Sequence, residues 1–308
     1  MSSPASPNHH VTRPLDGFGA AMMILLCLSW GFNQVAAKLA IHDIPPMTQA
    51  TIRSVIAGLL VAGWAKARGI ELLSRDGTLV AGLAAGVLFG IEFAFLYQGL
   101  LYTTATRAVL FLYTAPFFVV IGSRIFLPAD RFHWWQWTGL ILSFSGIALA
   151  FGVPTPAADP RQALGDVLIV LGALSWAATT LTIKASALTK VSAEKVMLYQ
   201  LVVSTPILAV FIPVFGEHMD RFPSTPALVA LAYQTVWVVS VTFVIWFWLV
   251  ARYSASRLSA FTFLSPLCGV AAGHLLLGEP LNEAFAVSVV LVGAGLVLVN
   301  RSSTQRAP

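Results

Sequence analysis

Side chains able to hold a small molecule occur inside long apolar stretches of this chain. Trp30 is followed three and four residues later by Asn33 and Gln34, and Trp176 is followed four residues later by Thr180. Residues three and four apart share one face of a helix, so each stretch would present an aromatic ring beside hydrogen-bonding groups. This pattern indicates either a surface that binds an aromatic or apolar molecule, or bulky packing residues with polar groups that join helices.

An acid also lies inside an apolar stretch. Glu92 shares one helix face with Phe89 and Phe93. An ionisable side chain in lipid-like surroundings indicates a functional group such as a proton relay, and a structural hydrogen bond is the alternative. The remaining candidates for the binding surface are Tyr97, Tyr113, Trp237 and Ser240.

Two prolines interrupt apolar runs at matching places. The sequence "ATRAVLFLYTAP" ends at Pro116 and the sequence "ASRLSAFTFLSP" ends at Pro266. A proline within a helix donates no backbone hydrogen bond and clashes with the carbonyl group four residues earlier. Within lipid, the freed carbonyl must be satisfied by protein, water or a ligand. We therefore predict a bend beside a cavity in each run, which serves either as a hinge or as a static kink.

Four cations stand at the ends of these stretches. Lys38 and Lys184 close the two tryptophan-containing stretches, and Arg107 and Arg257 open the two proline-containing ones. They are candidates for gates or for groups that face a substrate. The alternative is that each long side chain simply reaches the membrane surface.

The composition indicates the solvent in which these elements fold. The chain has 308 residues, of which 57% are hydrophobic and 10% are charged, and its mean hydropathy is +0.81. Soluble domains carry about 25% charged residues. A chain this apolar cannot cover its hydrophobic surface by folding in water, so we predict an integral membrane protein.

Ten stretches are long enough to cross a membrane as helices, each needing about 20 apolar residues. Gly82, Gly86 and Gly90 recur every fourth residue in the third stretch, which favours close packing against another helix. Strands of a membrane barrel would be shorter and alternate in polarity, so we predict an all-α integral membrane fold. The stretches lie near 18–40, 48–66, 78–100, 106–126, 133–151, 165–187, 194–214, 227–249, 257–277 and 282–300.

The 18 Lys and Arg residues predict the orientation of these helices. If ten helices cross in turn, most of the cations fall on the side that carries both termini. Cytoplasmic loops of membrane proteins carry such an excess, so we predict that both termini are cytoplasmic. The net charge of +5 reflects this bias and indicates no nucleic-acid partner.

The two halves of the chain repeat each other. "LSWGFNQVAAK" (28–38) matches "LSWAATTLTIK" (174–184), the two proline-containing runs match, and "GLILSFSG" (139–146) resembles "SVVLVGAG" (288–295). Three blocks in one order, each about 150 residues from its partner, indicate a duplication.

The duplication predicts the domain organisation. Each repeat holds five helices, an odd number, so the second must enter the membrane upside down. Inverted repeats are an architecture of secondary transporters, with the binding site near the midplane and alternating access to the two sides. We predict a disordered cytoplasmic tail (1–16), a first five-helix repeat (17–152), a linker loop (153–163), a second, inverted repeat (164–301) and a cytoplasmic tail (302–308).

Two segments resemble a known family. They are "QGLLYTTATRAVLFLYTAPFFVV" (98–120) and "ASRLSAFTFLSPLCGVAAGHLLLGEPL" (255–281), each preceded by an "LSW…K" helix. The chain resembles the ten-helix EamA-type branch of the drug/metabolite transporter superfamily. This resemblance implies a bacterial inner-membrane exporter of small metabolites, most similar to exporters of aromatic and other neutral amino acids. The first half lacks the Glu of the "LGEP" turn and reads "RIFLPADR" (124–131), so no counterpart of Glu279 is expected there.

Other functions find less support in the sequence. The chain has no HExxH motif, no nucleotide-binding loop, no metal-binding Cys/His spacing and no Asp-rich cluster, so we predict no enzyme activity, no metal and no cofactor. Cys27 and Cys268 suggest buried thiols. We expect a monomer whose partners are the bilayer and amino acids or related metabolites. The alternatives are a multidrug or amphipathic-cation exporter, a passive channel and an intramembrane enzyme.

Overall fold

A computed structural model describes residues 15–41, 43–127, 132–152, 156, 160–278, 281 and 283–301. The predicted terminal tails, apart from residues 15 and 16, lie outside the described residues. Most of the predicted linker and Glu279 also lie outside them. The described chain is built of helices, with no strand in these ranges, as the all-α prediction requires.

The helices differ in length and in regularity. The long ones are α1 (Gly17–Ile41), α2 (Pro46–Ala67), α3 (Leu79–Leu100), α6 (Trp134–Phe151), α7 (Pro160–Ala185), α8 (Ala193–Val214) and α13 (Phe285–Asn300). Shorter helices that join end to end are α4 (Ala105–Leu112) with α5 (Ala115–Phe126), and α11 (Ala255–Phe261) with α12 (Leu264–Leu277). A third composite consists of α9 (Thr225–Ala232), the π-helix η2 (Tyr233–Thr242) and α10 (Phe243–Arg252), and a short 3₁₀-helix, η1 (Ala187–Lys190), precedes α8.

Eight helical segments of the described chain are long and apolar enough to cross a membrane. They are α1, α2, α3, α4 with α5, α7, α8, the composite α9–η2–α10, and α11 with α12. The apolar helix α13 is shorter. Large apolar side chains such as Leu59, Val80 and Val297 are exposed on the outside of the bundle, where lipid would cover them. The protein is a multi-pass membrane protein.

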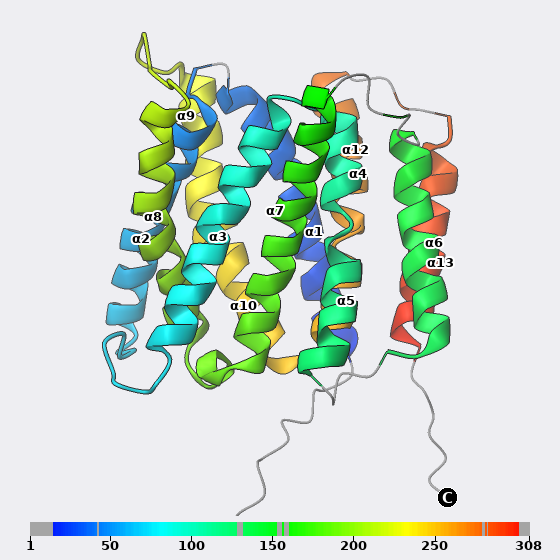
Figure 1. Ribbon diagram of the computed structural model, residues 1–308, viewed down its shortest axis with the longest axis horizontal. Helices are drawn as coiled ribbons and strands as arrows, with labels where there is room; N and C mark the ends of the chain where they lie inside the picture. Colours follow the sequence, from blue (N-terminus) through cyan, green and yellow to red (C-terminus); the bar gives the residue numbers. More distant parts are fainter. Residues whose placement is uncertain are drawn as a thin grey trace, which may run out of the picture.

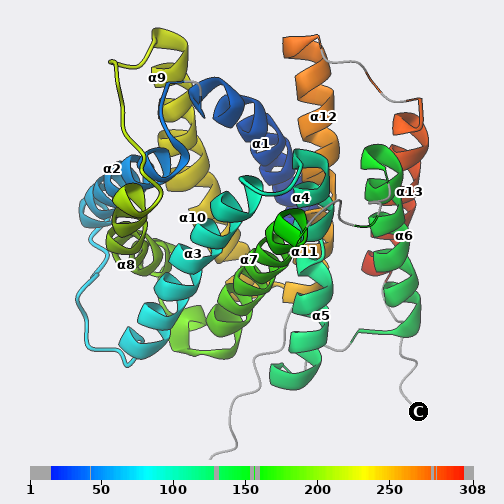
Figure 2. The same ribbon diagram turned by 45° about the horizontal axis from the view of Figure 1, so that its top comes forward.

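The helices stand side by side in one bundle (Figure 1). At one edge α2 packs against α8, and at the opposite edge α6 packs against α13, as both views show (Figure 2). Between these edges, α3 packs against α7 and α1 packs against α12. The helix α1 begins, and α13 ends, at the lower end of the bundle in Figure 1.

Both prolines fall where a membrane-length helix is broken. Tyr113 and Thr114 separate α4 from α5, and Pro116 lies in the first turn of α5. Thr262 and Phe263 separate α11 from α12 in the same way. Each of the two helices is thus interrupted near its proline.

The glycine stripe of α3 faces α8. A Cβ atom added at Gly86 would lie 2.5 Å from the Cβ of Val203 and 2.6 Å from the carbonyl oxygen of Tyr199. Gly82 and Gly90 are similarly crowded by side chains of α8. The predicted close packing is confirmed, and it lets the two backbones approach as small residues do in membrane helices.

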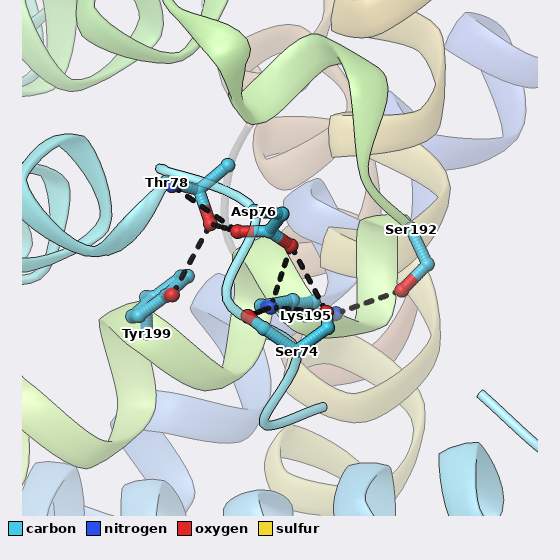
Figure 3. A network of polar contacts seen from close by, with 6 residues as sticks. All are labelled: Ser74, Asp76, Thr78, Ser192, Lys195 and Tyr199. Carbon is cyan, nitrogen blue, oxygen red and sulfur yellow. Dashed lines mark hydrogen bonds and ion pairs between the residues drawn. The ribbon is translucent and has the colours of Figure 1, made fainter. Parts of the chain in front are cut away.

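Polar contacts fasten both ends of the α2–α8 edge. At the lower end, Lys195 Nζ donates to Asp76 Oδ2 at 2.7 Å and to Ser74 Oγ at 3.0 Å, while the Thr78 hydroxyl donates to Asp76 Oδ1 at 2.5 Å (Figure 3). The bonds from Lys195 and then from Thr78 hold the pKa of Asp76 well below its ordinary value. The segment before α3 is thereby tied to the first turn of α8.

At the upper end, a carboxylate from another segment caps α2. Glu217 accepts hydrogen bonds from the backbone N–H groups of Met47 and Thr48, both at 2.8 Å, and from the Thr48 hydroxyl at 2.9 Å. The first N–H groups of a helix have no partner within the helix, and a negative charge there is favourable. This contact ties the end of α8 to the start of α2.

Candidate functional site

A cavity of about 200 Å³ lies in the interior of the bundle. Its walls come from α1, α2, α3, α7, η2 and α10, and from the regions of the two breaks before α5 and α12. Six of the predicted binding residues line it: Trp30, Asn33, Glu92, Phe93, Tyr113 and Trp176. Its other polar or aromatic lining residues are Gln34, Arg53, Phe243, Trp246, Thr262 and Ser265.

Three tryptophans form an aromatic wall of this cavity. Trp30 and Trp176 each lie 5.6 Å, centroid to centroid, from the buried ring of Trp246, the first edge-on and the second stacked. The indole N–H of Trp30 donates to the Thr242 hydroxyl at 3.0 Å. The two tryptophans predicted from the repeated sequence therefore meet through a third, which the sequence interpretation missed.

A basic and an acidic side chain border the same cavity. Arg53, from α2, is 6% exposed and Glu92, from α3, is 8% exposed. The guanidinium carbon of Arg53 lies 4.8 Å from the centroid of the Phe93 ring, a cation–π geometry. Sequence reasoning counted Arg53 only as a surface cation. Its position, more than a full turn inside an apolar helix, was the available signal.

Three buried polar atoms around the cavity have no hydrogen-bond partner among the described residues. They are Asn33 Oδ1, Arg53 Nε and Glu92 Oε2. Buried polar groups in folded proteins are nearly always paired with protein or water. Their gathering around one cavity indicates a site that takes a polar ligand or water.

Two predicted aromatic residues stand behind the cavity wall. The ring of Phe89 lies 5.0 Å from that of Phe93 and 6.1 Å from that of Phe243. The ring of Tyr97 lies 6.0 Å from Phe93 on its other side. Neither residue lines the cavity, but both support Phe93.

Three further predicted residues lie elsewhere. The Thr180 hydroxyl donates to the backbone carbonyl of Trp176 at 3.1 Å. The Trp237 indole donates to the Ser29 hydroxyl at 2.9 Å, on a different side of α1. Ser240 donates to its own helix backbone and borders a separate apolar groove of about 630 Å³ beside α1, α2, η2 and α10. Trp237 and Ser240 lie in the π-helix η2. A π-helix has more residues per turn than an α-helix, so both side chains point in other directions than they would on an α-helix.

The helix breaks open onto the cavity. Leu112 and Thr262, whose carbonyl groups precede the two prolines by four residues, both line it, as does Pro116. Near each break a threonine hydroxyl donates to a carbonyl three residues back, from Thr114 in one case and from Thr262 in the other, both at 2.6 Å. Backbone irregularity in this membrane protein thus occurs beside a cavity, where it can be satisfied. Whether these breaks move as hinges stays a prediction.

Acidic residues hold the starts of the broken helices. Arg107 Nε donates to both carboxylate oxygens of Asp166, at 3.0 and 3.2 Å, and a terminal nitrogen of the same guanidinium pairs with Oδ2. The Thr103 hydroxyl donates to Asp166 at 2.6 Å, and at the other end of the bundle the Tyr253 hydroxyl donates to Asp16 at 3.0 Å. Arg107 is therefore part of a buried contact between α4 and α7.

The other predicted gating cations lie at helix ends. Lys184 Nζ donates to the carbonyl oxygens of Val250 at 2.7 Å and Ala251 at 3.3 Å, in the last turn of α10, where a cation is favourable. Lys38 lies in the last turn of α1. Arg257 lies in the first turn of α11. Their roles as gates stay predictions.

Comparisons with known proteins give the family. The chain matches the EamA-like transporter family twice, over residues 17–152 and over residues 163–301. The chain belongs to the EamA-like transporter family. It is therefore a membrane transporter, and the resemblance stated from the sequence is confirmed.

Relatives of this EamA-like transporter cover nearly its whole length. It is 26% identical to the uncharacterized transporter YvbV of Bacillus subtilis, over 94% of this chain and 93% of that protein. It is 24% identical to a probable amino-acid metabolite efflux pump of Salmonella typhimurium, over 92% and 94%. A solved crystal structure, 18% identical, matches its fold with a TM-score of 0.79 over 90% of this chain and 94% of that chain.

Proposed function

We propose that this EamA-like transporter exports aromatic and other neutral amino acids across the bacterial inner membrane by alternating access. The observation that carries this proposal is the interior cavity, where indole rings from α1, α7 and α10 lie beside unpartnered polar atoms. Such a cavity offers an aromatic side chain stacking partners and offers the polar end of the same molecule hydrogen bonds. The name of the Salmonella relative supports amino-acid export.

The cavity favours amino acids over larger amphipathic drugs. Its volume of about 200 Å³ is below the roughly 300–1,000 Å³ of pockets that hold drug-sized ligands. Arg53 and Glu92 line the cavity as one basic and one acidic side chain. A purely cationic drug would be repelled by Arg53 and would find only Glu92 as an acidic partner among the described lining residues. The alternative of an amphipathic-cation exporter is therefore disfavoured.

Contacts at the α2–α8 edge support two inverted repeats. Thr48 is the third residue of α2 and bonds Glu217, which lies between α8 and α9. Lys195 is the third residue of α8 and bonds Asp76, which lies between α2 and α3. Exchanging the two halves turns one contact into the other, as a two-fold axis in the membrane plane requires.

The α6–α13 pair supports the same symmetry. A Cβ at Gly139 would lie 2.5 Å from the carbonyl oxygen of Gly295, and a Cβ at Gly146 would lie 2.9 Å from that of Ser288. Because 139–146 and 288–295 are matched segments of the repeat, these two contacts also exchange. We propose that ten helices in two inverted halves surround the cavity within one chain, with both termini in the cytoplasm.

Transport in liposomes tests this function. Vesicles that contain the purified protein are loaded with tryptophan, methionine or a cationic dye. They should release both amino acids faster than equally loaded vesicles without protein, and they should retain the dye. Repeating the assay with and without a pH gradient separates proton exchange from facilitated transport. Release of the dye without release of either amino acid would contradict the proposal and favour the drug exporter. Equal release of all three would indicate a channel.

A further inference from the structure

We infer that Arg53 and Glu92 form a head-group site that recognises the zwitterionic end of an α-amino acid, with Arg53 binding the carboxylate and Glu92 binding the ammonium group. This inference rests on the proposed function and names the part of the cavity that would select its substrate.

The burial of the two charges is the first step of the argument. Arg53 and Glu92 are both more than 90% buried, and Arg53 Nε and Glu92 Oε2 lack hydrogen-bond partners among the described residues. Leaving a buried charge incompletely paired is costly, and such groups mark functional positions inside membranes. A ligand that carries both opposite charges would pair both groups at once.

The chemistry of each group matches one end of an amino acid. A guanidinium group presents a planar fork of N–H donors that fits a carboxylate in a bidentate manner. The Phe93 ring, whose centroid lies 4.8 Å from the guanidinium carbon, packs on a face of that group and helps to hold its orientation. An ammonium group is a donor that needs acceptors, and Glu92 Oε2 and Asn33 Oδ1 are unpartnered acceptors that border the cavity.

The charge balance makes the site selective. An amino acid brings one charge of each sign, so a single ligand gives a partner to Arg53 and a partner to Glu92. Tryptamine, which lacks the carboxylate, would leave Arg53 unpaired, and indole-3-propionate, which lacks the ammonium group, would leave Glu92 unpaired. Sites built to pair a polar group reject analogues that lack it far more strongly than apolar pockets reject a missing methylene group.

Competition in proteoliposomes tests the inference. Uptake of labelled tryptophan by counterflow is measured with tryptamine or indole-3-propionate as competitor, for the wild type and for Arg53→Gln, Arg53→Lys and Glu92→Gln. The exposed Arg68 at the end of α2 gives the matched control, Arg68→Gln. Monodisperse elution in detergent checks that each variant is folded.

The wild type should prefer tryptophan over both analogues by about tenfold or more, the ratio that about 1.4 kcal/mol of lost pairing produces. Arg53→Gln should lower the apparent affinity for tryptophan and raise that for tryptamine relative to tryptophan. Glu92→Gln should likewise lower the affinity for tryptophan and raise that for indole-3-propionate relative to tryptophan. Arg53→Lys, which keeps the charge but loses the fork, should fall between the wild type and Arg53→Gln.

Two results would overturn the inference, and they differ in what they leave standing. The wild type could transport tryptophan while both analogues compete as well as unlabelled tryptophan does, or each variant could lower the apparent affinity for all three compounds alike. Either result would show that the head-group site is wrong, and amino-acid export would stand. If the wild type transports no amino acid, the proposed function fails and the inference fails with it.

Discussion

Trp246 shows how a functional residue can escape a search of the sequence. It lies within "FVIWFWLVAR" (243–252), where apolar and aromatic residues occur on all sides of the helix, so periodicity does not select the face that meets the cavity. Trp30 and Trp176 could be predicted because the repeat marks both and polar residues share their faces. Arg53 was missed because it was counted only among the 18 cations that predict the orientation.

Replacing Trp246 should weaken substrate binding more than folding. Trp246→Phe keeps an apolar ring but removes the indole that contacts both Trp30 and Trp176. We expect the KM for tryptophan to rise several-fold, since an aromatic pair contributes about 0.5–1.5 kcal/mol beyond its burial. Transport kinetics in proteoliposomes measure this, with the exposed Trp64 giving the control Trp64→Phe. An unchanged KM would remove Trp246 from the binding surface.

At the scale of helices, the sequence predicted the two proline breaks and the close packing of α3. It did not predict the π-helix η2. Both helices are interrupted near their prolines, because the loss of a backbone donor is a local property of the chain. Trp237 and Ser240 do not line the cavity. Both lie in the π-helix η2, whose register no hydrophobic pattern predicts.

The packing of α3 on α8 gives a prediction about stability. Gly86→Ala would place a Cβ 2.6 Å from a backbone oxygen of α8, and the helices must separate to admit it. We expect a loss of about 1–3 kcal/mol, typical of overpacking, measured as a lower melting temperature in detergent. Gly63→Ala, where nothing lies within 4 Å, is the control and should not lower it. Equal melting temperatures for both variants would mean that α3 and α8 do not pack this closely.

The contact between Asp76 and Lys195 gives a prediction about pH. Because the folded state depresses the pKa of Asp76, its contribution to stability is complete above the ordinary carboxyl pKa of about 3.9 and is lost as the pH falls below that value. Asp76→Asn should therefore lower the melting temperature at pH 7 and make a smaller difference at pH 3. The exposed Asp220 serves as control through Asp220→Asn. A difference that does not change with pH would exclude the charged contact as its cause.

For the whole molecule, composition and the length of the apolar runs predicted the all-helical membrane fold. The excess of apolar residues required a membrane, and the length of the apolar runs required helices. What the sequence could not give is which helices meet: the pairs α3–α7 and α1–α12 join residues far apart in the chain. The cavity that Arg53 and Glu92 border likewise joins residues from both halves of the chain.

Accessibility of the cavity from the two sides tests the central claim most directly. A variant without native cysteines, in which Cys27 and Cys268 are replaced by Ala, would carry Asn33→Cys on the cavity wall. A membrane-impermeant maleimide should label this cysteine when added to either side of the membrane, and tryptophan should slow labelling from both sides. Labelling from one side only, with and without tryptophan, would contradict a shared cavity that opens to each face in turn.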